Sequence, residues 1–378
     1  MKILHVIPSI SPLQGGPSHA VMELAKAQNS IGLKPTIIST DYLLDNNKII
    51  SSHRFQIKIF RSLKTPIRKI NSYGISLSLI IWLIKNISKY DLIHFHSLFS
   101  FTTTFGMIVS RLLKKKYIIR TIGQLMFWSL KQGSMHKKIY LFLIEKSNIE
   151  SSSCIHMTSQ LEVNEFKENF SHPMQINIPL GISIPQNKQK HIVKKKFVNY
   201  LFLSRIHPKK QLDLILKTLS IINKRGFYSW TLEIVGDGDK NYLNYLKNLS
   251  YKFNIDEKIK WHGFLQGEEK FNKIKNADWL ILPSHSENFG IAVAESLSFG
   301  LPVIISPHIG IAPFVEKYGA GYVVEPDKKK LCECLMNKAN SAPNIELRKS
   351  SVKLAKEVFS WNIISKKLLK SYNKILFN

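Results

Sequence analysis

The chain has 378 residues, of which 44% are hydrophobic, and a formal net charge of +28 at pH 7. This length suits two α/β domains better than one core, and the composition excludes a disordered chain and a membrane bundle. The basic excess is spread over both halves without a helix-turn-helix, an aromatic RNA-binding signature or a zinc finger, which favours a compositional bias over nucleic-acid binding.

In the N-terminal half, β-branched runs at 3–7, 35–39, 57–60, 92–96 and 117–120 predict strands, with helices at 18–31 and 75–88 between them. Such alternation predicts a parallel sheet with helices on both faces. The polar stretch at 179–196 indicates a linker.

The same pattern restarts after this stretch. Strands are predicted at 200–203, 231–235, 259–261, 279–283, 302–306 and 321–324, and helices at 211–224, 240–253, 268–275, 289–299 and 312–318. We therefore predict an α/β chain of two Rossmann-like, doubly wound domains facing a central cleft. The first would comprise residues 1–187 and the second residues 188–359, with a basic amphipathic helix at 360–378 able to pack back on the first.

The sequence has few features that indicate membrane insertion or export. The longest apolar runs are too short to cross a bilayer, the first residues are typical of a buried strand and not of a signal peptide, and three cysteines predict no disulfide framework. We expect a cytoplasmic protein. Lysine clusters at 114–116 and 131–138 would allow peripheral contact with an anionic membrane at its inner face.

The most informative segment is 283–302, where a strand ends in a polar loop and a helix follows. Glu287 lies at the carboxyl end of the strand, where open α/β sheets bind ligands, and can accept hydrogen bonds from sugar hydroxyls. Glu295, inside the helix, can accept from both hydroxyls of a ribose, with an ion pair to a buried lysine as the alternative. Four backbone amides would face a phosphate at the positive helix end: Asn288, Phe289, Gly290 and Ile291.

Arg205 and Lys210 lie five residues apart between a strand and a helix. Two cations at this spacing can neutralise a pyrophosphate, Arg205 with its planar fork and Lys210 as a point charge. Two loop cations that simply face water are the alternative.

Two further segments follow strands of the N-terminal half. Gly15 and Gly16 allow close approach of the backbone to a ligand, and the next helix offers free amides, although a tight turn without a ligand is equally compatible. His94 and His96 share one face of a strand, and His96 lies nearer its carboxyl end, where it can hydrogen-bond a sugar. A core or surface histidine is the alternative for His94.

Gly236 begins the sequence Gly236-Asp237-Gly238-Asp239, which follows a predicted strand and contains an Asp-x-Asp pattern. In some enzymes this pattern holds a divalent metal. Here a turn is the favoured interpretation, and we expect no metal site.

At these residues the chain resembles the retaining glycosyltransferases of family 4, which have the GT-B fold. The likeness rests on the Gly15-Gly16 loop, His96, Arg205 with Lys210, the Gly236 turn, His262-Gly263-Phe264, and Glu287 with Glu295. The segment 120–124 is similar to a variant of an Arg-Gly-rich loop in some relatives, which suggests acceptor contacts there.

The resemblance implies roles for the candidate residues. Arg205 and Lys210 would bind the donor diphosphate, Glu295 the ribose, and the backbone near Phe264 the base. Glu287, with the amides of Phe289 and Gly290, would bind the donor sugar, and His96 would line its pocket. Transfer would retain the anomeric configuration without a metal, with electrostatic stabilisation of the departing diphosphate as the main catalytic contribution.

The predicted function is therefore that of an enzyme of the hexosyltransferase type. It would move a sugar from a nucleoside-diphosphate donor to a glycan or lipid-linked acceptor in the synthesis of bacterial surface polysaccharide (O-antigen or capsule), with no cofactor and no nucleic acid as partner. Two alternatives remain open. A sugar-nucleotide epimerase of the same fold would convert the donor without an acceptor, and a basic nucleic-acid-binding protein would bind DNA or RNA with a steep salt dependence.

Overall fold

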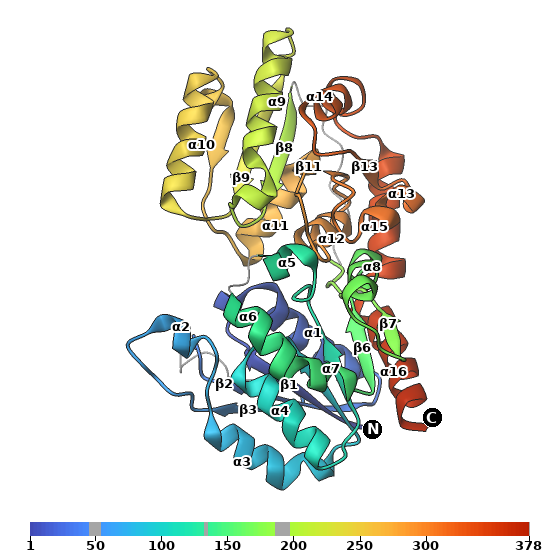
Figure 1. Cartoon of the computed structure of the whole chain (residues 1–378). Helices are drawn as coiled ribbons and strands as arrows, with labels where there is room; N and C mark the ends of the chain where they lie inside the picture. Colours follow the sequence, from blue (N-terminus) through green and yellow to red (C-terminus); the bar gives the residue numbers. More distant parts are fainter. Residues whose placement is uncertain (45–53, 132–134, 186–196, 378) are drawn as a thin grey trace. The chain divides into compact units, whose positions relative to one another are not determined.

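The computed structural model describes residues 1–44, 54–131, 135–185 and 197–377. The chain forms two compact units (Figure 1). Unit 1 comprises Met1–Gly181 and Trp361–Asn378, and unit 2 comprises Ile182–Ser360. The predicted boundary between residues 187 and 188 falls in 186–196, outside the described residues, and stays a prediction.

Unit 1 is built on a seven-stranded parallel sheet with the order β3-β2-β1-β4-β5-β6-β7. The five predicted strands are confirmed to within a few residues, whereas the short strands β6 and β7 were not predicted. The strands are β1 (Lys2–Ser9), β2 (Lys34–Thr40), β3 (Gln56–Phe60), β4 (Leu92–His96), β5 (Tyr117–Arg120), β6 (Cys154–Met157) and β7 (Gln175–Asn177).

The helices of unit 1 cover both faces of this sheet. They are α1 (Gly16–Ser30), α2 (Arg68–Asn71), α3 (Leu77–Asn86), α4 (Phe101–Leu112), α5 (Phe127–Lys131), α6 (Met135–Tyr140), α7 (Lys146–Glu150), α8 (Gln160–Asn169) and α16 (Trp361–Phe377). Short 3-10 turns lie at η1 (Pro12–Gln14) and η2 (Ile87–Lys89), and η3 (Leu141–Glu145) is a π-helical segment.

The two faces of the sheet in unit 1 differ in polarity. Alternate strand residues such as Leu4, Ile93 and Phe95 point into a buried apolar core, which also includes Leu83 of α3 and Met107 of α4. The residues between them point to the opposite face, because successive side chains of a strand alternate. That face includes several buried histidines.

The C-terminal helix α16 belongs to unit 1, where it packs against α1 (Figure 1, red and blue). Lys116 donates hydrogen bonds to the carbonyl oxygens of Ile375 (2.7 Å) and Leu376 (3.3 Å). A cation at this position satisfies carbonyl groups that have no partner inside the helix and complements the helix dipole. Lys115 likewise donates to the carbonyl of Tyr90, so two lysines of the 114–116 cluster have structural contacts.

Unit 2 is built on a six-stranded parallel sheet with the order β10-β9-β8-β11-β12-β13. All six predicted strands are confirmed: β8 (Val198–Leu203), β9 (Trp230–Val235), β10 (Ile259–Trp261), β11 (Trp279–Leu282), β12 (Val303–Ile305) and β13 (Gly321–Val323). The central strands β8 and β11 are buried throughout, which explains their continuous apolar sequence.

The five helices predicted in unit 2 are also confirmed, with ends that differ by up to two residues. They are α9 (Leu212–Lys224), α10 (Lys240–Lys252), α11 (Gly267–Asn276), α12 (Ile291–Ser298) and α13 (Ala312–Tyr318). The structure adds α14 (Lys328–Asn337), α15 (Ile345–Val358) and the 3-10 turns η4 (Pro208–Lys210) and η5 (Asp256–Lys258).

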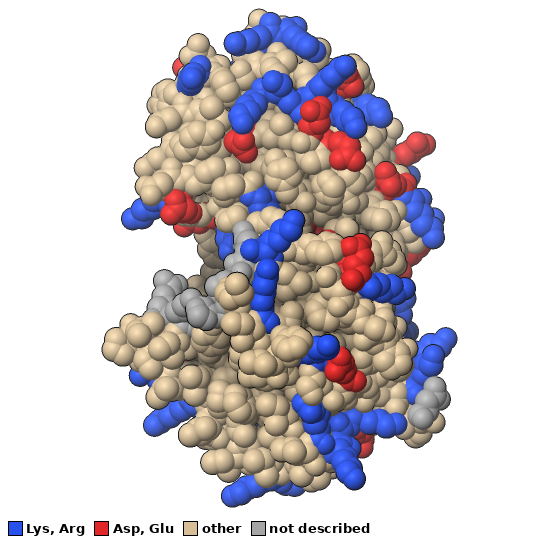
Figure 2. All heavy atoms as spheres, in the orientation of Figure 1, with Lys and Arg blue, Asp and Glu red and all other residues tan. Residues whose placement is uncertain are grey.

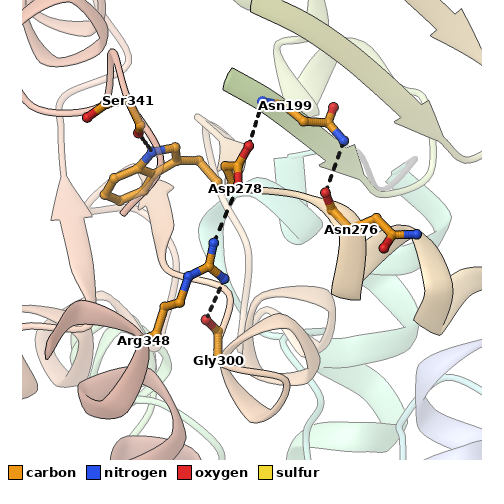
Figure 3. A network of polar contacts seen from close by, with 7 residues as sticks. Asn199, Asn276, Asp278, Gly300, Ser341 and Arg348 are labelled. Carbon is orange, nitrogen blue, oxygen red and sulfur yellow. Dashed lines mark hydrogen bonds and ion pairs between the residues drawn. The ribbon is translucent and has the colours of Figure 1, made fainter. Parts of the chain in front are cut away.

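A polar network ties the amino ends of β8 and β11 to the helices behind them (Figure 3). The carboxylate of Asp278 accepts from the backbone amide of Asn199 (2.9 Å) and from Arg348 of α15 (3.4 Å). Arg348 also donates to the carbonyl of Gly300 after α12 (3.3 Å). Because this network lies at the amino ends of the strands, it stabilises the sheet at the edge opposite to the loops where ligands bind in such sheets.

Two observations bear on membrane and nucleic-acid partners. Among the described residues, no helix has the length and apolar character needed to span a bilayer. Figure 2 shows lysines and arginines scattered over both units on the face in view, without a continuous basic stripe.

Candidate functional site

Three loops of unit 2 meet at the carboxyl ends of neighbouring strands β8, β11 and β12. The amide of His285, after β11, donates to the carbonyl of Lys209, after β8 (2.9 Å). Glu287 exchanges backbone hydrogen bonds with the loop after β12, donating to His308 (2.9 Å) and accepting from Gly310 (3.0 Å). The chain runs from β8 outward to β9 on one side and returns as β11 on the other. This is a topological switch point, where open α/β sheets bind ligands.

The backbones of the loops after β8 and β9 lie in direct contact. A Cβ atom on Gly236, whose φ is +147°, would lie 1.9 Å from the carbonyl oxygen of Ser204, and one on Gly238 would lie 2.1 Å from that of Ile206. Only glycine allows such an approach. Asp239 caps α10, accepting from the amides of its first turn at 3.0 and 3.1 Å. Asp239 therefore serves as a helix cap, and the expectation that the Asp-x-Asp segment holds no metal stays a prediction.

Lys210 and Glu287 form an ion pair within the three converging loops. Lys210 is only 9% exposed, and burial, together with the nearby cations Lys209 and Arg205, lowers its pKa to about 7. The pairing joins the loop after β8 to the loop after β11. The two predicted site residues are thus in direct contact, although 77 positions of sequence separate them.

Arg205 is exposed in the loop after β8, and no ion pair of its guanidinium is found in the described part of the chain. Its positive charge contributes to lowering the pKa of both His207 and Lys210. A guanidinium in this position can add a forked pair of donors to the point charge of Lys210.

The N-terminus of α12 opens onto the same loops. Gly290 is its N-cap residue with φ of +96°, and no side chain caps the helix. A Cβ atom on Gly290 would lie 2.8 Å from a methyl group of Ile309, so glycine is needed here. Phe289 is buried and packs edge-on against Phe359 at 5.4 Å. Because Gly290 has no side chain, the N-cap supplies no acceptor to the first-turn amides of this eight-residue helix, as suits an anion site.

Glu295 lies one turn into α12 and forms an ion pair with Lys270 of α11. Both carboxylate oxygens accept from the Lys270 Nζ atom, and both side chains are half-buried. The ion-pair alternative is therefore present in the structure. Sequence reasoning missed Lys270, because it is one of several lysines in a charged helix and carries no motif signal.

Phe264 is 65% exposed in the loop after β10. This loop is fixed to the Gly236 turn by a hydrogen bond from the Gly236 amide to the Gly263 carbonyl (2.8 Å). Nearby, the Glu233 carboxylate accepts from Lys273 (2.9 Å) and lies 3.1 Å from His262. An exposed aromatic ring beside a fixed backbone is a surface on which a planar base can stack.

The remaining predicted residues lie in unit 1. Gly15 has a left-handed φ of +76° and is the N-cap of α1, and Gly16 is the first residue of that helix, without a capping side chain. His96 is fully buried, and its Nε2 atom lies 2.8 Å from His5 Nδ1. One nitrogen of each of His5, His94 and His96 lies within 4.8 Å of the others, close enough to share a metal ion.

Comparison with known proteins supports the C-terminal assignment. Residues 183–358 match the family described as glycosyl transferases group 1. An uncharacterized glycosyltransferase of Methanocaldococcus jannaschii is 26% identical over 267 residues, which is 64% of this chain and 64% of that protein. The Escherichia coli UDP-Gal:alpha-D-GlcNAc-diphosphoundecaprenol alpha-1,3-galactosyltransferase is 28% identical over 255 residues, which is 63% of each chain. The chain therefore spans just under two thirds of the length of these relatives.

The fold is also that of solved structures. The Anabaena protein HepE, solved in complex with UDP and glucose, superposes with a TM-score of 0.74 at 17% identity, covering 99% of this chain and 100% of that one. The predicted pair of Rossmann-like units, the GT-B fold, is confirmed by this likeness and by the two parallel sheets.

Proposed function

We propose, because residues 183–358 match the family described as glycosyl transferases group 1, that the chain moves a sugar from a nucleoside-diphosphate donor to a glycan or lipid-linked acceptor. The observation that carries this proposal is the convergence of Lys210, Glu287 and the N-terminus of α12 at the carboxyl ends of β8, β11 and β12. Cations and free amides there match a diphosphate, and a carboxylate matches sugar hydroxyls.

Each part of the donor then has a partner in unit 2. Lys210, Arg205 and the backbone amides from Asn288 to Ile291, which lead into α12, bind the diphosphate, and Glu295 accepts from the ribose hydroxyls. The base lies against the Gly236 and Phe264 loops. Glu287 binds the transferred sugar. The roles of His96, Gly15 and Gly16, which lie in unit 1, stay predictions.

The Lys210–Glu287 ion pair would also couple the binding of the diphosphate to the recognition of the sugar. We infer that the diphosphate replaces Glu287 as the partner of Lys210, because an anion with several oxygens offers the ammonium group more acceptors than one carboxylate. The exchange releases Glu287 to accept from sugar hydroxyls. Donor binding and sugar recognition are then coupled through one contact.

The proposed catalysis depends on stabilising the negative charge that develops on the leaving phosphate. As the bond between the anomeric carbon and the diphosphate breaks, negative charge grows on the leaving phosphate, where Lys210, Arg205 and the helix dipole stabilise it. The acceptor oxygen attacks from the face that the diphosphate leaves and gives its proton to a departing phosphate oxygen, so the anomeric configuration is retained. These protein charges take the place of a metal ion, and turnover needs no divalent cation.

The compared proteins suggest a substrate class. HepE was solved with UDP and glucose, and the Escherichia coli relative is named for a UDP-galactose donor and a diphosphoundecaprenol-linked acceptor. We propose a uridine-diphosphate sugar as the first donor to test and a lipid-linked glycan of surface polysaccharide synthesis as the acceptor.

A lipid-linked acceptor places the protein at a membrane, and one surface of unit 1 fits this role. In α6 and η3, Met135, Ile139, Phe142 and Leu143 are exposed, Met135 and Phe142 at 70%. Phe142 lies three residues and Leu143 four residues after Ile139, which lies four after Met135, so all four lie near one helical face. Lys138 of α6 and Lys146, the first residue of α7, are also exposed. Apolar side chains flanked by lysines match the interface of an anionic bilayer.

The reaction is tested with a panel of sugar-nucleotide donors. Purified protein is incubated with uridine, guanosine and adenosine diphosphate sugars, with and without a lipid-linked glycan acceptor, in the presence of EDTA. We expect acceptor-dependent release of nucleoside diphosphate with one donor, and its loss in Lys210→Met and Glu287→Gln but not in the surface control Lys217→Met. Conversion of a donor to another sugar nucleotide without acceptor would instead identify an epimerase, and loss of turnover with EDTA would refute metal independence.

The membrane contact has its own test. We expect the protein to float with vesicles that contain anionic phosphatidylglycerol, and Phe142→Ser with Leu143→Ser to abolish this, whereas Leu77→Ser on the exposed side of α3 should not. Equal flotation of the Phe142/Leu143 variant and the wild type would refute the assigned surface.

A further inference from the structure

Gln211 has a backbone conformation that its side chain disfavours. It follows Lys210 directly and lies in the left-handed region, with φ of +56° and ψ of +41°. Apart from glycines, only Asn254 has a positive φ among the residues of unit 2 that the structure describes. Asparagine tolerates this region because its short side chain bonds locally, whereas the longer side chain of Gln211 has no such compensation. Glycine would remove the steric cost at position 211.

The side chain of Gln211 lowers stability in two further respects. Gln211 is the N-cap residue of α9, but its side chain makes no capping hydrogen bond to that helix, as Asn, Asp or Ser would. Its Oε1 atom is buried and has no hydrogen-bond partner within the described ranges of the chain, and an unpaired buried acceptor is costly. A residue that opposes stability in several ways at once is expected where function requires its side chain.

Gln211 lies among the residues of the candidate site in unit 2. Its Nε2 atom contacts the Nε2 atom of His285, and the backbone amide of His285 donates to the carbonyl of Lys209 (2.9 Å). The preceding residue, Lys210, forms the ion pair with Glu287. Two consecutive side chains of the loop after β8 therefore contact the loop after β11. The buried end of the Gln211 amide lies where these two loops meet.

The contact with His285 determines which end of the Gln211 amide is left for a ligand. A carboxamide has an acceptor oxygen and a donor nitrogen, and a histidine ring nitrogen either accepts or donates. When His285 Nε2 has a lone pair, Gln211 Nε2 donates to it and Oε1 is left buried without a partner, as in the structure. When His285 Nε2 carries a proton, it donates to Gln211 Oε1, and the turned-over NH₂ group is left instead.

We propose that Gln211 donates a hydrogen bond from this NH₂ group to the diphosphate of the donor, and that His285 is a positioning residue that holds Gln211 Oε1 away from the phosphate. This inference rests on the proposed function. A diphosphate has only acceptor oxygens and a negative charge, so it attracts an NH₂ group and repels a carbonyl oxygen. Diphosphate binding therefore selects the turned-over amide and gives both of its polar atoms a partner.

A purely structural role is the alternative for the contact between Gln211 and His285. It would hold the loops after β8 and β11 together. The backbone hydrogen bond from His285 to Lys209 and the ion pair of Lys210 with Glu287 already join these loops. A contact that served only stability would not leave a buried oxygen without a partner. A ligand contact explains why a long polar side chain occupies a position that favours glycine.

Stability and affinity together distinguish the two roles. Gln211→Gly should raise the midpoint of urea unfolding, because it removes the left-handed strain and the unpaired oxygen. It should also weaken UDP binding about tenfold, the loss of roughly one hydrogen bond to a charged group. The matched control Asn254→Gly, after α10, should leave UDP affinity unchanged. A lower unfolding midpoint of Gln211→Gly together with wild-type UDP affinity would overturn the proposal.

Two near-isosteric variants identify the end of the amide that faces the ligand. Gln211→Glu can still accept from His285 but presents an oxygen in place of the NH₂ group, so it should bind UDP more weakly than Gln211→Met does. Wild-type affinity in Gln211→Glu would overturn the assigned donor. The loss in Gln211→Met should be equal for UDP and UDP-glucose and much smaller for uridine, which has no phosphate. A loss confined to UDP-glucose would overturn the diphosphate contact in favour of the sugar.

The positioning role of His285 is tested by combining substitutions. His285→Ala lets the Gln211 amide turn freely and should weaken UDP binding roughly threefold, less than the loss of the whole hydrogen bond. In the Gln211→Met background, His285→Ala should have no further effect, because His285 acts only through the amide. An equal effect of His285→Ala in both backgrounds would mean that His285 contacts the diphosphate itself or supports the loops in general, and would overturn the positioning role.

Failure of the proposed function gives a different result from failure of this inference. Binding is measured by calorimetry with UDP, GDP and ADP, and the nucleotide that the wild type binds most tightly is used in all the comparisons. If the wild type binds none of them, the proposed function fails, and this inference fails with it. If the wild type binds one of them and the Gln211 variants bind it equally well, the diphosphate contact of Gln211 is wrong and the proposed function stands.

Discussion

The Nζ atom of Lys270 lies 2.8 Å from one carboxylate oxygen of Glu295 and 2.9 Å from the other. Both side chains are half-buried, so the cost of desolvation offsets much of the attraction in this ion pair. Each carboxylate oxygen also keeps a second lone pair for another donor. The contact with Lys270 therefore orients Glu295 and leaves it able to accept from a ribose, so the two interpretations of Glu295 are compatible.

Glu295→Ala should abolish recognition of the ribose. We expect the wild type to bind UDP about tenfold or more tightly than 2′-deoxy-UDP, because an unpaired buried acceptor penalises the analogue. In Glu295→Ala the two nucleotides should bind equally, as measured by calorimetry. Lys270→Met, the matched control, should keep most of the preference. If Glu295→Ala kept the preference for UDP over 2′-deoxy-UDP, the proposed contact with the ribose would be wrong, and Glu295 would only form the ion pair with Lys270.

Diphosphate affinity should depend on pH through Lys210. Burial and neighbouring cations lower its pKa to about 7, so the ammonium form is present below this pH and is lost above it. UDP should therefore bind progressively more weakly as the pH rises from 6 to 9. Lys210→Arg keeps its charge throughout this range, and its affinity should be nearly constant. If the UDP affinities of the wild type and of Lys210→Arg changed with pH in the same way, a lowered pKa of Lys210 would be contradicted.

Gly236→Ala should destabilise unit 2 by roughly 3 kcal/mol or more, because the new Cβ would overlap a backbone oxygen that cannot move alone. Gly319→Ala is the matched control. It has a left-handed φ of +59° but no atom within 4 Å of its Cβ position, and should cost only about 1–2 kcal/mol. Urea unfolding of the two variants measures the difference, and equal losses would show that the loop adapts.

The buried histidines should make unit 1 sensitive to acid. Burial lowers the pKa of His5 to about 4 and that of His156 to about 3, and also lowers those of His94 and His96. In the unfolded chain these rings take up protons as the pH falls through 6.5, whereas in the folded chain all four do so only at lower pH, His5 near pH 4 and His156 near pH 3. Stability present above pH 6.5 is therefore lost progressively toward pH 4.

The measurement is urea unfolding at pH 7 and pH 5. The free energy of unfolding should fall between these conditions, and the fall should be smaller in His156→Gln, which removes one titrating ring and can keep the hydrogen bond to Ile178. Equal stability at both pH values would contradict neutral buried rings.

The sequence predicted the α/β class and most strands, because period and composition are local properties. Strand β4 and helix α13 were predicted with their observed ends. Strands β6 and β7 were missed, since three or four residues are too few for a periodic signal. The loops at Arg205 and Glu287 were identified because the carboxyl ends of parallel strands bind ligands wherever the fold occurs.

Other features depend on contacts between residues far apart in the chain. That Lys210 meets Glu287, and that Glu295 meets Lys270, follows from the strand order of unit 2. The register of β1, β4, β5 and β6 places four histidines and Arg120 on one face, and α16 brings Tyr372 to them from the end of the chain. No local pattern encodes these pairings, because the register between strands far apart in the chain arises only when the sheet is assembled.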